Sequence, residues 1–211
     1  MTVQPEQRAV PTKSARTRAR ILDAAASVFR TQGYAARLSD IAERAGIQTG
    51  SLYYHFGSRE ELVAEILRLG IENAWNHVRA AVDALPSDTS PLERLATAIR
   101  AHTMAVLELS DYASAQTRIV GQVPPALASA HRREQRRYGI YWSGLLEAAS
   151  EAGELAADLD LFTARMLAFG AMNWTAEWSV AQRGADATAI ADQAVAVLVG
   201  GLARRPQNRQ P

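Results

Sequence analysis

Hydrogen-bonding side chains of several kinds follow one another closely between Gly46 and Gly57. They are an amide, two small hydroxyls, two phenols and an imidazole: Gln48, Thr49, Ser51, Tyr53, Tyr54 and His55. Such groups can donate to and accept from base edges and phosphates in the major groove of DNA. Gly50 would let the backbone approach DNA closely, and exposed N–H groups near it can bind a phosphate. Each residue alone more often packs or caps a helix, but together they favour DNA contact.

The surrounding apolar residues predict two short helices that hold this polar segment on a surface. Apolar side chains at positions 41, 45, 47, 52 and 56 can form one small core and leave the polar groups outside. Each helix has about seven residues, too few to be stable alone, so both must pack on a first helix over about 16–30. This is the helix-turn-helix arrangement. Ser39 is expected to cap the first short helix, and Gln48 or Thr49 to begin the second.

The rest of the chain predicts an all-α protein of about nine helices. Ser58, followed by Glu60 and Glu61, predicts the start of a long helix over 59–85. Further helices are expected over 91–109, 112–121, 126–152, 160–182 and 186–204. Four regions follow: a flexible basic arm over 1–15, a three-helix head over 16–58, a ligand-binding and dimerisation body over 59–204, and a disordered tail over 205–211.

Charge and composition separate the head from the body. Residues 1–60 carry nine Lys or Arg against five Asp or Glu, whereas the whole chain of 211 residues has a net charge of only +1. A basic head is typical of nucleic-acid binding, although a short Arg-rich arm alone would also bias the count. The N-terminus lacks the apolar region of a secretory signal, and the longest apolar run is too short for a bilayer. We expect a cytoplasmic, nucleoid-associated protein without a membrane partner.

No catalytic or metal-binding constellation is visible in the sequence. Cysteine is absent, and the four histidines are scattered without paired ligand spacing. We therefore expect neither an enzyme nor a cofactor. Two alternatives to a DNA-binding protein stay open: a helical dimerising interaction protein, and a small all-α enzyme. The interaction protein would not account for the polar face at 48–55, and nothing in the sequence proposes a reaction for the enzyme.

Aromatic residues with a few polar groups suggest an apolar ligand site in the body. The candidates, which can also be ordinary core residues, are Trp75, His102, Val106, Tyr112, Tyr138, Trp142, Phe169, Asn173 and Trp174. Four arginines, at positions 132, 133, 136 and 137, form a cluster on one helix. They can bind ligand phosphates at the mouth of the site or form a solvated face.

The last two predicted helices, over about 160–182 and 186–204, are apolar on more than one face. One face of each is therefore left for a partner. Two such helices from each subunit would form a four-helix bundle and make the protein a homodimer. Two-fold symmetry would then present two recognition helices roughly 34–36 Å apart, one turn of DNA.

The segment over about 16–62, with DIAERAGIQTGSLYYHFGSREEL at its centre, resembles the DNA-binding domain of the TetR family of bacterial transcriptional repressors. The resemblance implies a homodimer that binds double-stranded operator DNA of palindromic sequence. It also implies that recognition-helix and phosphate-contact positions are occupied by Ser39, Gln48, Thr49, Ser51, Tyr53, Tyr54, His55 and Arg59. Many members carry Lys where this chain has Thr49. The only lysine is Lys13, so arginines such as Arg16, Arg18 and Arg20 must supply the remaining backbone contacts.

The body, from about Arg137 to Trp178, is similar to the C-terminal domain of TetR-type repressors that govern lipid or sterol catabolism. Those repressors release DNA when they bind acyl-CoA thioesters. The resemblance implies a small, mostly apolar or acyl-CoA-like effector. Its binding would tilt the long 59–85 helix and move the two heads out of register with the DNA.

Overall fold

The computed structural model describes residues 12–109, 111–179 and 186–203, and within these ranges the protein is all-α. These ranges contain nine α-helices and one π-helical turn, and the only β pairing in them is an isolated bridge between Leu155 and Ala203. The predicted fold class is confirmed. No helix in the described ranges combines the length and apolar character needed to cross a membrane.

Three helices form the head: α1 (Lys13–Gln32), α2 (Leu38–Ala45) and α3 (Thr49–His55). Thr12 caps α1 by accepting a hydrogen bond from the N–H of Ala15 at 3.2 Å. Residues 13–15 are therefore helical, so the boundary predicted for the arm was too late; residues 1–11 lie outside the described part. Gly46 ends α2 at φ 64°, a left-handed conformation that few other residues adopt readily.

The head has one continuous hydrophobic core. Its largest fully buried side chains are Ile21, Phe29, Ile41, Leu52 and Phe56. The same core also takes in residues of the body, chiefly Leu62, Val63, Ile66, Ala115 and Ile119. A domain boundary at residue 58 therefore separates the recognition elements, but it does not mark the end of the head's core.

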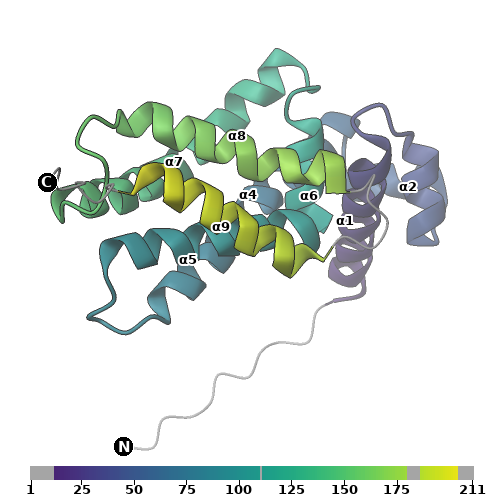
Figure 1. Cartoon of the computed structure of the whole chain (residues 1–211). Coiled ribbons are helices and arrows are strands. Elements are labelled where there is room, and N and C mark those ends of the chain that lie inside the picture. Colours follow the sequence, from purple (N-terminus) through teal and green to yellow (C-terminus); the bar gives the residue numbers. More distant parts are fainter. Residues whose placement is uncertain (1–11, 110, 180–185, 204–211) are drawn as a thin grey trace, which may run out of the picture.

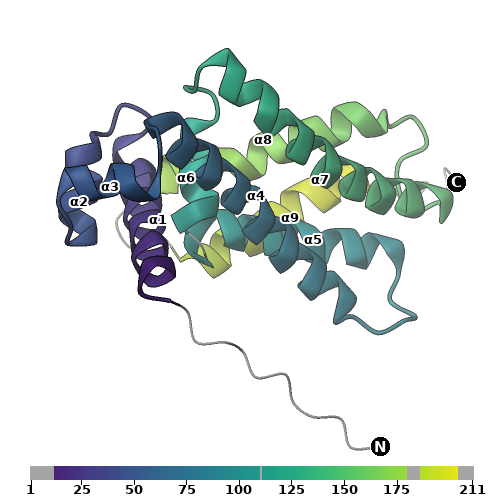
Figure 2. The ribbon, with the colours of Figure 1, turned by 180° about the vertical axis from the view of Figure 1, so that it is seen from behind.

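The long helix α4 (Arg59–Asp83) runs from the head into the body (Figures 1 and 2). Ser58 caps it as predicted, accepting from the N–H of Glu61 at 3.0 Å. Its 25 residues span about 37 Å at 1.5 Å per residue. The first half packs in the head core, and the second half, with Val78 and Val82, packs in the body core. One rigid element therefore belongs to both parts.

The body consists of α5 (Pro91–Met104), the π turn η1 (Ala105–Leu109), α6 (Asp111–Ile119), α7 (Pro125–Glu151), α8 (Leu161–Ser179) and α9 (Ala187–Leu202). Ser90 and Glu93 form a reciprocal capping box that begins α5. The helix predicted over 91–109 loses its regular pitch at Ala105, where η1 begins. In Figure 1, α8 and α9 lie side by side on the front of the body, and Figure 2 shows α4 on the opposite face.

Gly70 allows α6 to cross α4 with almost no space between the two backbones. A Cβ atom at Gly70 would lie 2.3 Å from Cβ of Gln116 and 2.6 Å from the carbonyl oxygen of Tyr112. Any larger residue at this position would therefore force the two helices apart. This close crossing places α6 between the head and the rest of the body.

Candidate DNA-binding surface and effector cavity

Helix α3 is sharply two-sided. Leu52 and Phe56 are wholly buried, whereas Tyr53 and Tyr54 are 52% and 84% exposed. Gln48, Thr49, Gly50 and Ser51 are exposed, and His55 is partly buried with its ring 5.3 Å from that of Tyr54. Gln48 occupies the N-cap position without a side-chain capping bond, so its amide is not used by the helix. Helix α3 lies at one end of the molecule (Figure 2), so its exposed polar groups are accessible to a partner.

Ser39 does not cap α2, and the expectation that it would is wrong. The helix begins one residue earlier, at Leu38, with Arg37 in the extended conformation at its N-cap. Ser39 is exposed in the first turn, where its hydroxyl donates to Oδ1 of Asp40 at 3.1 Å. Its predicted role as a phosphate contact is compatible with this exposure.

The basic residues of α1 divide into two groups. Lys13 and Arg16 are exposed in the first turn, where the sequence predicted DNA backbone contacts. Arg18 instead pairs with Glu65 at 3.3 Å and lies over the ring of Phe56, 4.7 Å from its centroid. Arg18 thus ties α1 to α4.

Arg59 has a structural position inside the head. Its guanidinium donates to the carbonyl of Ala36 at 2.7 Å and to the carbonyl of Tyr34, and it lies over the rings of Phe29 and Tyr34. These contacts fix the loop between α1 and α2 against the start of α4. A DNA contact by Arg59 stays a prediction. In this structure the guanidinium of Arg59 already bonds to the carbonyls of Ala36 and Tyr34.

A cavity of about 490 Å³ lies in the body between α4, α5, α6, α7 and α8. Four of the predicted ligand residues line it: His102, Tyr138, Phe169 and Asn173. Trp142 is buried behind them, with its ring 5.1 Å from Phe169 and 6.1 Å from Tyr138. Tyr138 and Phe169 thus give the wall two aromatic rings among aliphatic and polar side chains, and the size and chemistry of the cavity suit a small-molecule site.

The other predicted ligand residues lie elsewhere. Trp75 packs on Tyr138 with ring centroids 6.2 Å apart and carries the guanidinium of Arg137 on its ring. Val106 is a buried residue of the π turn and is not part of the cavity wall. Trp174 is 64% exposed on α8 and does not line the cavity. Apolar character alone does not distinguish a cavity wall from an outer face.

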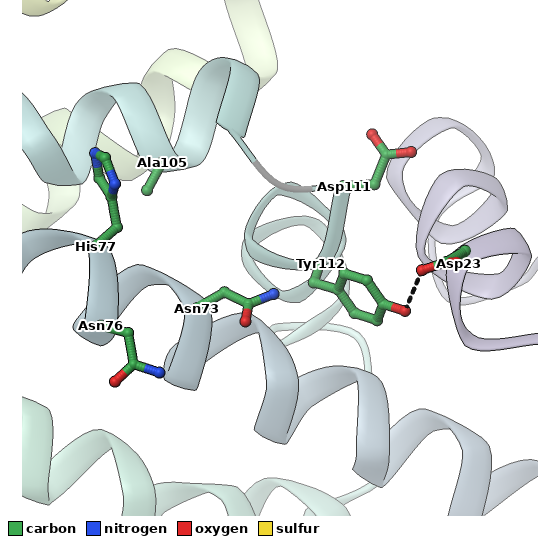
Figure 3. Close-up of a pocket in the computed structure, with 7 residues that line it drawn as sticks. All are labelled: Asp23, Asn73, Asn76, His77, Ala105, Asp111 and Tyr112. Carbon is green, nitrogen blue, oxygen red and sulfur yellow. Dashed lines mark hydrogen bonds between the residues drawn. The ribbon is translucent and has the colours of Figure 1, made fainter. Parts of the chain in front are cut away.

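Tyr112 lines a different cavity of about 610 Å³ at the junction of the head and body (Figure 3). Its hydroxyl donates to Oδ1 of Asp23 on α1 at 2.6 Å. The remaining walls carry amide and carboxylate groups, including Asn73, Asn76 and Asp111. The cavity of about 490 Å³ is the better candidate for an effector site, because it combines apolar side chains with several convergent polar groups.

Three polar residues of this cavity were missed by sequence reasoning: Gln116, Gln135 and Arg165. A fourth, Arg136, belongs to the arginine cluster that the sequence analysis offered for ligand phosphates. Arg165 is four residues before Phe169, which is four before Asn173, so all three share one face of α8. That spacing could have identified Arg165. Gln116 is brought to the wall by the close α4–α6 crossing, which no local pattern reveals.

Two family models match the chain. The model "Bacterial regulatory proteins, tetR family" matches residues 21–66, and the model "Tetracyclin repressor-like, C-terminal domain" matches residues 88–202. The transcriptional repressor KstR2 of Mycobacterium tuberculosis is 31% identical over 89% of this chain and 93% of its own length. KstR2 of Rhodococcus jostii is 33% identical over 88% and 91% of the two chains. The fatty acid metabolism regulator of Bacillus subtilis is 25% identical over 86% and 93%.

Solved structures give the same result for the fold. The ketosteroid transcriptional regulator KstR2 of M. tuberculosis superposes with a TM-score of 0.74 at 26% identity, covering 96% of this chain and 98% of its own. FadR of B. subtilis, solved with stearoyl-CoA, has a TM-score of 0.69 at 24% identity, covering 87% and 98%. Since one family model spans more than half of the sequence and these repressors align along almost all of it, the chain belongs to the TetR family of DNA-binding bacterial regulators.

Proposed function

We propose that the protein is a homodimeric transcriptional repressor, rather than an enzyme, that binds a palindromic operator and is released by an acyl-CoA thioester. The observation that carries this proposal is the position of α6. Gln116 of α6 lines the effector cavity, while Tyr112 and Asp111 of the same helix bond to Asp23 and Arg30 of α1. An effector in the cavity therefore lies against a helix that also holds the DNA-binding head.

The chemistry of the cavity supports a thioester with an apolar acyl group. Its aromatic walls would enclose the acyl group, and two arginines, Arg136 and Arg165, line it as well. Arg136 is exposed, next to the exposed Arg132 and Arg133 on α7. Guanidinium groups bind phosphates by charge-assisted hydrogen bonds, so this cluster would hold the phosphates of CoA. The FadR relative was solved with stearoyl-CoA, which supports the same effector class.

The apolar outer face of α8 and α9 supports dimerisation. Phe162, Leu167 and Trp174 on α8 and Val197 on α9 are each at least 64% exposed. Leu167 and Trp174 lie seven positions apart and so share one face of α8, and exposed apolar side chains of this size are typical of a surface that packs on a partner. A second copy packed on this face, as predicted for the helices over 160–182 and 186–204, would bury them in a four-helix bundle. Residues 180–182 and 204 lie outside the described part.

Release from DNA would follow from a shift between two arrangements of the head. The effector must bind the arrangement that does not fit the operator more tightly, because an effector with equal affinity for both would shift nothing. Helices α4 and α6 would move together, since Gly70 leaves no room for independent sliding. Their displacement would change the distance between the two α3 helices.

The test uses the full-length protein and fluorescently labelled DNA from its own promoter. We expect tight binding of a palindromic fragment in fluorescence anisotropy, weakened by added salt, and release by long-chain acyl-CoA but not by free CoA. Free fatty acid of the same length is the matched control for the CoA group. If no acyl-CoA changes the affinity for the operator, the proposed effector class is wrong. If the protein binds no promoter fragment, the repressor assignment is wrong.

A further inference from the structure

The proposed function assigns no ligand to the cavity between the head and the body, which we call the junction cavity. It has a volume of about 610 Å³, and its walls come from α1, α4, η1 and α6 (Figure 3). A molecule bound there would touch the head through Asp23 and the body through residues such as His77 and Ala105. Because it would contact both parts of the chain at once, it would favour the arrangement that this structure shows.

Three polar side chains of this wall are available to a ligand. Oδ1 of Asp23 accepts from the Tyr112 hydroxyl at 2.6 Å, while the second carboxylate oxygen has no hydrogen-bond partner in the described ranges. The side chains of Asn76 and His77 have none there either. Asp23 and Asn76 are exposed, and His77 is partly buried. A ligand could therefore bond to these groups without breaking a contact within the protein.

The charge of the wall is negative. Asp23 and Asp111 line the junction cavity, and no lysine or arginine of the described ranges does. Arg30 balances the charge of Asp111 through a contact of 2.7 Å, whereas Asp23 has no ion-pair partner in those ranges. Burial raises the pKa of the Tyr112 phenol, and the hydrogen bond to Asp23 and the surrounding carboxylates raise it further. The carboxylate of Asp23 is therefore the unbalanced charge at this site.

The other groups of the wall add hydrogen-bond acceptors and apolar surface. His77 adds no positive charge near pH 7, because burial lowers its pKa below the 6.5 of an exposed imidazole. A neutral imidazole can accept a hydrogen bond at one ring nitrogen, and the Asn76 amide can accept at its oxygen. The methyl group of Ala105 and the ring of Tyr112 lie in the same wall. This combination suits a ligand with a positively charged donor and an apolar part.

We propose that the junction cavity binds a small organic ammonium compound, whose charged nitrogen donates to the carboxylate of Asp23 and whose apolar part lies against Ala105 and Tyr112. An ammonium group carries donors and no acceptor, so it also matches the Asn76 oxygen and the neutral ring of His77. A carboxylate or phosphate ligand would instead be repelled by Asp23. The site therefore takes a ligand of the opposite charge to a CoA thioester, and this inference does not depend on the effector proposed for the other cavity.

The test measures the binding of hexylamine, benzylamine, 2-phenylethylamine and cyclohexylmethylamine to the full-length protein at neutral pH and constant ionic strength. These primary amines are positively charged at this pH, as the lysine side chain is. Each is compared with the alcohol of the same carbon skeleton, which lacks the charge. Dissociation constants come from NMR titration of the protein. We expect at least one amine to bind about tenfold more tightly than its alcohol, because hydrogen bonds between charged groups are stronger than those between neutral ones.

Two variants locate the bound ammonium group. Asp23→Asn removes the charge but keeps the size of the side chain and an oxygen that can accept from Tyr112. The amine should then bind no more tightly than its alcohol, while the affinity for the alcohol is unchanged. Glu43→Gln removes the same charge from an exposed position of α2 outside the cavity and should keep the preference, which makes it the matched control. Thermal unfolding checks that both variants fold.

Each outcome decides the inference. If no amine binds more tightly than its alcohol, the junction cavity is not a site for an organic cation and the inference is wrong. A preference that survives in Asp23→Asn would place the ammonium group elsewhere on the molecule and would also overturn it. A preference that disappears in Asp23→Asn and persists in Glu43→Gln supports it. Since these readouts use no CoA thioester and no DNA, failure of the proposed function would leave them unaffected.

Discussion

Neighbouring residues of α3 differ sharply in burial. Substitutions on its exposed side can therefore change DNA binding without changing folding stability. Leu52 is wholly buried, while Tyr54, two positions later, is 84% exposed. Truncating Leu52 would cost about 2–5 kcal/mol of folding stability through the cavity that it leaves. Truncating Tyr54 would remove little packing, so any effect on DNA binding can be assigned to the lost contact.

We expect Tyr54→Ala to weaken operator binding by roughly 1–3 kcal/mol and to change folding stability by less than about 0.5 kcal/mol. Anisotropy titration gives the first quantity and urea denaturation the second. Glu43→Ala, at an exposed position of α2, is the control for removal of a surface side chain. Unchanged operator affinity in Tyr54→Ala would remove Tyr54 from the DNA-contact surface.

Two buried histidines make folding stability depend on pH. Burial lowers the pKa of both His102 and His131 to about 4, below the 6.5 of an exposed imidazole. The unfolded chain therefore binds more protons between these values, and protons shift the equilibrium toward it. The stabilisation is complete above about pH 6.5 and is lost as the pH falls toward 4. His102→Gln should flatten this part of the stability curve, measured by urea denaturation from pH 4 to 8. A curve of unchanged slope would show that His102 does not titrate in this range.

At the scale of elements, the sequence predicted helix starts best, through their capping residues, and contacts between distant elements least well. Ser58 caps α4 as its residue type predicted, and Asp186 caps α9 by accepting from the N–H of Thr188. The π turn after Met104 has no local signature, since it arises where α5 meets the elements packed around it. Membership of the cavity wall depends on the relative rotation of α7 and α8. Residue type therefore selected Tyr138 and Asn173, which line the cavity, but it could not show that Trp174 faces outward.

Helix α6 is the element through which the effector and the head can influence one another. We expect Tyr112→Phe, which removes the bond to Asp23, to leave effector affinity nearly unchanged but to reduce effector-dependent release of the operator. The reason is that α6 would hold α1 less firmly while the cavity keeps its walls. The readout is the acyl-CoA concentration that releases half of the labelled operator.

Tyr141→Phe provides the matched control for this prediction. Its buried hydroxyl has no hydrogen-bond partner among the described residues, so its removal should leave both release and stability unchanged or slightly improved. If Tyr112→Phe behaves like Tyr141→Phe, the contact between α6 and α1 does not transmit the effector signal.

At the scale of the whole molecule, the proposed function makes DNA recognition depend on the outer face of α8 and α9 as well as on the head. A single seven-residue helix reads only one half-site, so the affinity for a palindrome requires that α8 and α9 hold two chains together. The sequence predicted that these two helices hold the chains together, because α8 and α9 are apolar on more than one face and one core can bury only one of those faces. In the single chain Leu167 and Val197 are 68% and 70% exposed, which is compatible with this prediction.

We expect Leu167→Glu to convert the dimer into a monomer, because each unpaired carboxylate buried in the interface would cost about 3–5 kcal/mol. Light scattering after size-exclusion chromatography gives the mass, and circular dichroism checks that the helices remain. Operator affinity should fall with the dimer, even though α3 is untouched. Ala80→Glu places the same charge at an exposed position of α4, on the opposite face of the body, and should remain dimeric. A Leu167→Glu protein that is still a dimer with full operator affinity would place the interface elsewhere on the molecule.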